Sequence, residues 1–200
     1  MIKALLAALV IIAGGVYYFF FHPPVVMKRA TSAALDRFGE AVATKDRAKI
    51  SDTLKNLLTP DAKINLEVNF FAIGNQKRPL TQDFTKDTFI SFVDNTLYPL
   101  TDYNYEARLT KFSLADDRKT AQVSFTSKEW ADGAQMFGGA AVNMRFSSET
   151  QCEGSVTFTE MKPQLSGAIC KMQFRSVPKP GEAARLNNME GLREMLIQQR

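Results

Sequence analysis

An uncharged, mostly apolar segment near the N-terminus most constrains what this chain can become. Residues 4–21 carry no charge and end in the aromatic run Tyr17-Tyr18-Phe19-Phe20-Phe21. Roughly 17–25 apolar residues form a membrane-spanning helix, and aromatic side chains are typical of the membrane–water interface. The prolines of His22-Pro23-Pro24 lack an N–H donor and are expected to end that helix. We therefore predict a signal anchor over residues 1–24, with residues 4–21 in the membrane.

A cleaved signal peptide is the alternative for this segment. Ala13-Gly14-Gly15 would be its small-residue cleavage site. Cleavage there would leave residues 16–21 as an exposed apolar N-terminus, which is unfavourable for a soluble protein. The uncleaved anchor is therefore the preferred interpretation.

The side of the membrane is predicted from weaker features. Lys3 lies before the apolar segment and Lys28 and Arg29 lie after it, so the flanking charges nearly balance. A short leader before the span is typical of signal anchors, and the two cysteines suit an oxidising compartment. We expect a single-pass protein of the inner (cell) membrane with its domain on the outer, periplasmic side.

The totals predict one folded domain. The chain has 200 residues, of which 45% are hydrophobic and 23% charged, as in ordinary globular proteins. The net charge of +4 is mild, and the basic residues form neither a run nor a stripe with interleaved aromatics. We expect no nucleic-acid partner. The domain is predicted over 25–177, followed by a Pro/Gly break and an amphipathic helix or tail over 178–200.

Three amphipathic helices are predicted from apolar residues at helical spacing. They cover residues 27–45, 47–58 and 86–97. Asp46 is the expected N-cap of the second helix and Thr85 that of the third, since short polar side chains accept the unpaired N–H groups of a first turn.

The strands are predicted from alternation of apolar and polar residues, beginning with Ile64, Leu66, Val68 and Phe70. Later strands are expected over 103–114 with a bulge, 120–130, 142–158 and 165–175. The turn of the last hairpin is placed at 161–164, and the side chains expected to point inward are Val156, Phe158, Ala168, Cys170, Met172 and Phe174.

Two cysteines fall on the last two strands. Cys152 and Cys170 could face each other across the hairpin, and an exported domain would oxidise them to a disulfide. The alternative is a pair of buried thiols in a cytosolic core.

The order helix, helix, strand, helix and then long strands resembles the nuclear transport factor 2-like superfamily, the cystatin-like cone that includes ketosteroid isomerase. The resemblance spans about residues 27–176 and includes the turns Leu57-Leu58-Thr59-Pro60-Asp61-Ala62 and Thr85-Lys86-Asp87-Thr88-Phe89-Ile90. It implies an α+β fold in which N-terminal helices pack on a curved, mostly antiparallel sheet. It also implies a pocket at the open end, used by some members for catalysis and by others for binding or assembly.

The plan of one N-terminal span and a domain of this fold also resembles inner-membrane subunits of bacterial secretion machines. A subunit that assembles a secretion or envelope complex is therefore an alternative function. A homodimer is possible under either interpretation.

Catalysis that depends on histidine is not expected. The only histidine, His22, lies outside the predicted domain, so neither a Ser-His-Asp nor a Cys-His arrangement can form within it. Two cysteines without a histidine partner do not make a zinc site, and Asp116-Asp117 reads as a solvated turn. We predict no metal and no cofactor.

Proton transfer by a buried carboxylate remains as an alternative chemistry, that of a small lyase or isomerase. Asp61 is the weak candidate for the base, and Tyr103 or Tyr105 could supply a hydroxyl for a developing oxyanion. A turn-forming Asp61 and a core Tyr105 are the favoured interpretations.

The glycine-rich segment 131–141 is predicted to be a loop joining two strands. It carries Met136 and Phe137, so a mobile flap over a pocket is one hypothesis and a loose hairpin end the other. Trp130, the only tryptophan, is expected on the other face of its strand from Val123 and Phe125, where it could anchor an interface.

The leading function predicted from the sequence is a non-catalytic, membrane-anchored envelope domain. It would bind a partner protein or an apolar small molecule. Because no catalytic set of residues stands out, the sequence leans away from an enzyme.

Overall fold

The computed structural model describes residues 17–18, 21–72, 75–76, 79–97, 100–137 and 140–182. Within them lie the helices α2 (Pro23–Ala43), α3 (Arg47–Leu57) and α4 (Lys86–Leu97). The strands are β1 (Leu58–Ala72), β2 (Asn75–Gln76), β3 (Leu80–Thr85), β4 (Thr101–Leu114), β5 (Thr120–Phe137), β6 (Ala140–Thr159) and β7 (Lys162–Pro178).

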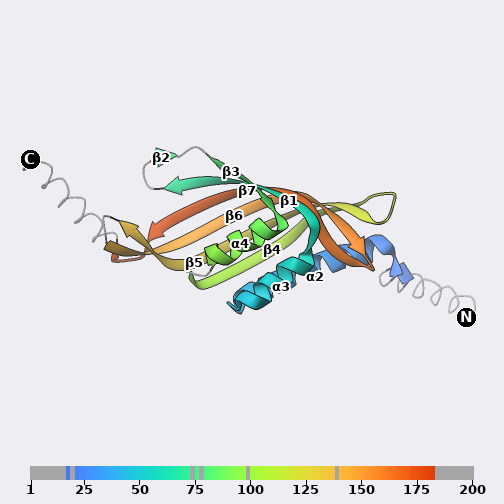
Figure 1. The fold of residues 1–200 in the computed structure, drawn as a ribbon, viewed down its shortest axis with the longest axis horizontal. Coiled ribbons are helices and arrows are strands. Elements are labelled where there is room, and N and C mark those ends of the chain that lie inside the picture. Colours follow the sequence, from blue (N-terminus) through green and yellow to red (C-terminus); the bar gives the residue numbers. More distant parts are fainter. Residues whose placement is uncertain are drawn as a thin grey trace, which may run out of the picture.

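The three helices pack on one face of a long, curved sheet (Figure 1). In the described part of the chain the sheet has seven strands in the order β2-β1-β7-β6-β5-β4, and β3 also pairs with β1. All pairs are antiparallel except β1 with β7, which run parallel. The predicted α+β class and the mostly antiparallel sheet are confirmed.

The helix predicted from residue 27 begins earlier, at Pro23. Proline is favoured in a first helical turn, where its missing N–H costs nothing and its fixed φ suits the helix. His22 is extended at the N-cap, and its carbonyl accepts from Val25 and Val26. His22-Pro23-Pro24 therefore begins helix α2.

The predicted cap of α3 is confirmed. The Asp46 carboxylate accepts hydrogen bonds from the backbone N–H groups of Ala48 at 2.9 Å and Lys49 at 3.2 Å. Helix α4 begins where it was predicted, and the Thr85 and Thr88 hydroxyls and the Thr85 N–H form a local hydrogen-bonded turn at its start. Local capping chemistry is readable from sequence in both cases.

Strand β3 was missed by the sequence prediction. It pairs antiparallel with β1, from Lys63 opposite Thr85 to Val68 opposite Leu80. Only Phe84 in this strand is buried. A polar strand at the edge of a sheet has no alternation strong enough to reveal it.

The loop predicted over 131–141 is also wrong. Strand β5 continues to Phe137 and β6 begins at Ala140, so Ala131 to Phe137 pair with Ala140 to Phe146 as one long hairpin arm. Gly133 lies in this arm, and a Cβ at this position would meet the Phe146 ring at 2.9 Å, so a larger residue would not fit. The glycine marks close packing within a strand and not a loop.

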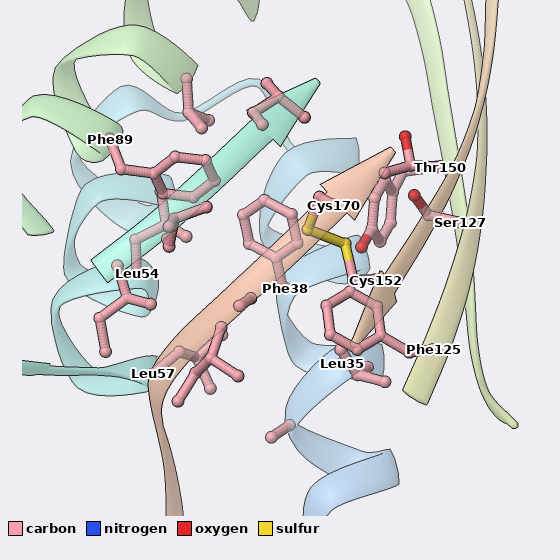
Figure 2. Close-up of a pocket in the computed structure, with 18 of the residues that line it drawn as sticks. Leu35, Phe38, Leu54, Leu57, Phe89, Phe125, Ser127, Thr150, Cys152 and Cys170 are labelled. Carbon is pink, nitrogen blue, oxygen red and sulfur yellow. A yellow bond between two sulfur atoms is a disulfide. The ribbon is translucent and has the colours of Figure 1, made fainter. Parts of the chain in front are cut away.

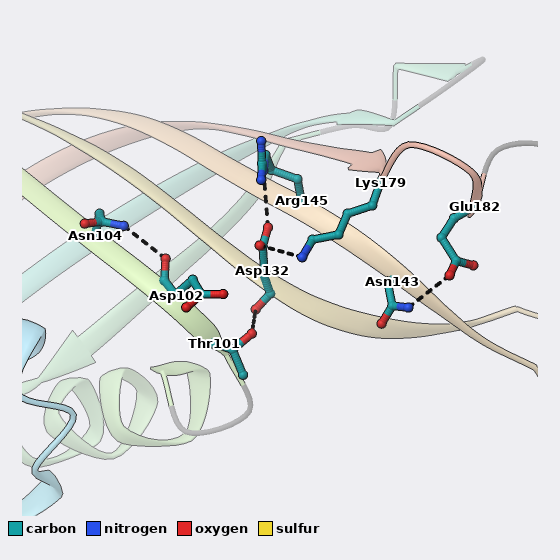
Figure 3. A network of polar contacts seen from close by, with 8 residues as sticks. All are labelled: Thr101, Asp102, Asn104, Asp132, Asn143, Arg145, Lys179 and Glu182. Carbon is teal, nitrogen blue, oxygen red and sulfur yellow. Dashed lines mark hydrogen bonds and ion pairs between the residues drawn. The ribbon is translucent and has the colours of Figure 1, made fainter.

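A polar network joins the base of this arm to the chain after β7 (Figure 3). The Asp132 carboxylate accepts from Arg145 on β6 at 3.2 Å and from Lys179 at 2.6 Å. Hydrogen bonds from these two cations hold the pKa of Asp132 below its ordinary value. The network fixes the end of β7 and the break that follows it against the arm.

The last hairpin turns at Glu160 and Met161, one residue before the predicted turn. Both residues have positive φ, 51° and 66°, as a two-residue hairpin turn requires. Of the side chains predicted to point inward, Val156, Phe158, Ala168 and Cys170 are buried, and Met172 and Phe174 are half-buried.

The predicted membrane anchor lies almost wholly outside the described residues. No helix among those described is long and apolar enough to cross a membrane. Tyr17, Tyr18 and Phe21, at the end of the predicted span, are exposed. The predicted tail lies outside the described residues from position 183 onward.

Candidate functional site

A cavity of about 210 Å³ lies between the three helices and the inner face of the sheet (Figure 2). Leu35 and Phe38 enter it from α2, Leu54 and Leu57 from α3, and Phe89 from α4. The cavity is larger than the ~150 Å³ apolar cavity that is known to accept benzene. A small organic molecule therefore fits this space.

The cavity explains an unusual property of α4. This helix has an apolar face but no fully buried residue. Its residues Phe89, Phe92, Val93 and Leu97 are half-buried and line the cavity. Phe89 and Phe92 also contact the ring of Phe84 on β3, so the apolar face of α4 both packs on the sheet and covers the cavity.

Most of the cavity wall is apolar, but strands β4, β5 and β6 contribute a band of polar side chains. Glu129 on β5 lies opposite Tyr105 on β4 and Ser148 on β6. One step along the same face, Ser127 lies opposite Thr150. Residues two apart on a strand share a face, so these hydroxyls and one carboxyl group gather at one region of the wall.

Glu129 is the acidic member of this band. Its carboxylate accepts hydrogen bonds from the hydroxyls of Ser148 at 3.1 Å, Ser127 at 3.4 Å and Tyr103. Burial in the apolar cavity raises the pKa of Glu129 above its ordinary value, and these hydrogen bonds offset only part of that shift. No described lysine, arginine or histidine lines the cavity beside it.

Both predicted tyrosines line the cavity. Burial and the negative charge of Glu129 raise the pKa of the Tyr103 and Tyr105 hydroxyls well above the ordinary value. Both tyrosines therefore remain neutral at physiological pH. The Tyr105 ring meets Phe38 of α2 edge-on at 5.1 Å, which holds this end of the cavity wall against the helix.

The Thr150 hydroxyl is buried and has no hydrogen-bond partner among the described residues. It lines the cavity near the disulfide (Figure 2). A buried polar atom is nearly always hydrogen-bonded, because leaving it unpaired costs free energy. Thr150 therefore offers a hydrogen bond to an occupant of the cavity.

Cys152 and Cys170 form the predicted disulfide. They lie directly opposite each other on β6 and β7, and both line the cavity beside Phe125 and Thr150 (Figure 2). The disulfide is part of the cavity wall as well as a link between strands.

Asp61 is not in the cavity. It is exposed and does not line the enclosed space. Alternation along β1 turns Ala62 and Ile64 inward, so Asp61 lies on the outward side with Lys63. The candidate base predicted from sequence is therefore replaced by Glu129 as the carboxylate inside the domain.

The alternation along β5 indicates Glu129. Ala121, Val123 and Phe125 share one face of the strand, and the same alternation places Ser127 and Glu129 on that face. A glutamate at the end of an apolar face, opposite tyrosines on a neighbouring strand, indicates a buried acid.

The other predicted site residues lie on β5. Trp130 is 39% exposed and points to the opposite face from Glu129, as its place in the alternation predicts. The backbones of Met136 and Phe137 belong to the hairpin arm, paired with Ala141 and Ala140. The described residues contain no group of acidic, cysteine or histidine side chains that could hold a metal ion.

No protein-family model matches this sequence, and neither does any curated protein. Several solved structures are similar to it. A putative scytalone dehydratase from Novosphingobium aromaticivorans is 9% identical with a TM-score of 0.46, and the match covers 78% of this chain and 87% of that one. A ketosteroid isomerase-like protein from Erwinia carotovora atroseptica is 13% identical with a TM-score of 0.41, covering 76% and 98%.

A domain of unknown function with a cystatin-like fold from Nostoc punctiforme is 10% identical with a TM-score of 0.43, and the match covers 72% of this chain and 75% of that one. At these identities and scores the likenesses assign no activity to the chain. The functional argument rests on the cavity itself.

Proposed function

We propose that this chain is a membrane-anchored, nuclear transport factor 2-like domain that binds a small, mainly apolar molecule in the cavity under α4. The single observation that carries the proposal is the cavity of about 210 Å³, with an apolar wall and one polar band. Pockets for small molecules combine these two features, because apolar contact supplies affinity and a few polar groups fix orientation.

The unpartnered Thr150 hydroxyl supports binding over a merely loose core. A poorly packed core would not place an unpaired hydroxyl, a buried acid and two neutral tyrosines at one region of the wall. The Thr150 hydroxyl gains a partner if the cavity is occupied by a molecule with a polar group.

The anchor and the periplasmic side remain proposals. The exposed aromatics Tyr17, Tyr18 and Phe21 support an interfacial position for the end of residues 4–21. The Cys152–Cys170 disulfide supports an oxidising compartment.

Partly filling the cavity should weaken binding. Ala34 of α2 is buried and lines the cavity, whereas its neighbour Ala33 is exposed. We expect Ala34→Leu to weaken binding of an apolar probe such as 2-phenylethanol at least about tenfold, because one added side chain occupies the space that the ring needs. The measurement is a ligand-observed NMR titration of the full-length chain in phosphatidylcholine nanodiscs.

Ala33→Leu makes the same change on the outer side of α2 and should leave binding unchanged. Circular dichroism and thermal unfolding establish that both variants fold. Equal probe affinity of Ala34→Leu and the parent protein would place the bound probe elsewhere and contradict the proposal.

Proton transfer is a second candidate function, favoured by the hydrogen bond between Glu129 and Tyr103 inside an apolar cavity. A carboxylate with a raised pKa is a suitable general base for a proton beside a carbonyl group, and a neutral tyrosine can donate to the resulting enolate oxygen. This is the lyase or isomerase alternative, with Glu129 in the place of Asp61.

Deuterium exchange tests the second candidate directly. Incubation of 4-phenyl-2-butanone with the protein in D₂O should exchange the protons beside the carbonyl, and Glu129→Gln should reduce the exchange rate by about 10²-fold or more. Asp61→Asn should have no effect, because Asp61 is exposed and outside the cavity. Exchange no faster than in buffer would reject this activity for that ketone class and leave the binding function standing.

A further inference from the structure

The cavity wall has an unbalanced charge. Among the described residues that line it, Glu129 is the only charged one, and none is cationic. The described ion pairs involve other acids, all outside the cavity: Asp52, Asp94, Asp132 and Glu149. An ionised carboxylate in an apolar enclosure is costly unless a cation accompanies it.

The groups that contact Glu129 suit its ionised form. Ser127, Ser148 and Tyr103 can each donate an O–H to the carboxylate. These three hydroxyl donors stabilise a negative charge on the Glu129 carboxylate, but they carry no positive charge to neutralise it. A cationic occupant would complete it, whereas an anionic occupant would meet repulsion from Glu129.

The remaining wall is suited to an organic cation. The rings of Phe38, Phe89, Phe92, Phe125 and the two tyrosines line the same cavity. The face of an aromatic ring attracts an ammonium group, and the attraction is strongest where water is excluded. The unpartnered Thr150 oxygen, buried in the same wall, can accept an N–H from such a group.

We propose that the natural ligand of the cavity is a small aromatic or aliphatic amine, bound as its ammonium ion with the charged end at Glu129 and Thr150 and the apolar body under α4. This inference rests on the proposed binding function and names the chemical class of its ligand. It excludes carboxylates, including fatty acids, as preferred ligands.

Three probes that share a phenyl ring and a short chain test the inference. They are 2-phenylethylamine, 2-phenylethanol and phenylacetate, which differ in the charge of the end group. Their dissociation constants are measured by ligand-observed NMR with the full-length chain in phosphatidylcholine nanodiscs, and empty nanodiscs serve as the blank. We expect the amine to bind about tenfold tighter than the alcohol or better, and phenylacetate to bind weakest.

Substitution of the carboxylate provides the decisive control. Glu129→Gln keeps hydrogen-bonding capacity but removes the charge, so the amine should lose its advantage over the alcohol while the alcohol still binds. Glu106→Gln makes the same change in net charge on the exposed face of β4 and should preserve the advantage.

The possible failures are distinguishable. Equal binding of amine and alcohol by the parent protein, or an amine advantage that survives in Glu129→Gln, overturns the amine inference and leaves the cavity as a binding site. Absence of binding by all three probes contradicts the proposed binding function, and the amine inference falls with it.

Discussion

Two opposing effects act on the pKa of the Glu129 carboxyl group. Transfer from water into the apolar cavity favours the protonated form, and the hydroxyls of Ser127, Ser148 and Tyr103 favour the ionised form. Burial is the larger influence, so the pKa is raised. Asp61, which the sequence argument selected from its turn position, is exposed and lies outside the cavity.

The stability of the domain should depend on the protonation of Glu129. A folded-state pKa above the unfolded value of about 4.3 means that the native state binds the extra proton. Stability is therefore lost as pH rises from that unfolded value through the raised folded value, by at most about 1.4 kcal/mol per pH unit. Urea denaturation of the parent protein and Glu129→Gln at several pH values between 4 and 8 measures this difference.

Glu129→Gln removes the titration, so its stability relative to the parent should increase across that window and then level off. Below the window the two differ only by a constant. Parallel stability curves across the whole range would mean that the carboxyl group is not sequestered from water. The acids Asp94, Asp117 and Asp132 have lowered pKa values and act on both proteins alike at lower pH.

At the scale of elements, the disulfide joins β6 to β7 at the cavity wall. The bond closes a loop with a sequence separation of 18, and loops of this size restrict the unfolded chain enough to stabilise the native state by about 2–4 kcal/mol. Dithiothreitol should therefore lower the thermal midpoint by roughly 5–15 °C. Thermal unfolding with and without reductant measures this change.

The double variant Cys152→Ala, Cys170→Ala is the control for the reductant. It should unfold at a lower temperature than the oxidised parent and show no response to dithiothreitol. If the parent protein also fails to respond, although thiol titration shows two reduced cysteines, the cross-link contributes little to stability.

Sequence patterns predicted some elements because their determinants are local. Asp46 caps α3 through hydrogen bonds within a few residues, and the facing positions of Cys152 and Cys170 follow from one hairpin. Strand β3 was missed because its pairing with β1 leaves a mostly exposed, polar strand. The arm around Gly133 was missed because the ring of Phe146, which explains that glycine, comes from the next strand.

The cavity belongs to the scale of the whole molecule. Each helix predicted from sequence shows an apolar face, but the pattern does not reveal whether that face meets side chains or an empty space. Only the placement of α2, α3 and α4 over the curved sheet leaves Phe89 and Phe92 half-buried around an enclosure. The tyrosines were predicted as candidates, and their meeting with Glu129 required the register of β4, β5 and β6.

The parallel pairing of β1 with β7 has a consequence for how the domain is made. Ile64 pairs with Ala168, roughly a hundred residues later in the chain. The pairing of β1 with β7 can therefore form only after the last strand has been synthesised. Until then the hydrogen-bonding edge of β1 is open to other chains. If the domain is exported behind its anchor, β1 reaches the far side of the membrane long before β7. A periplasmic chaperone that shields the open edge of β1 would then raise the yield of folded protein.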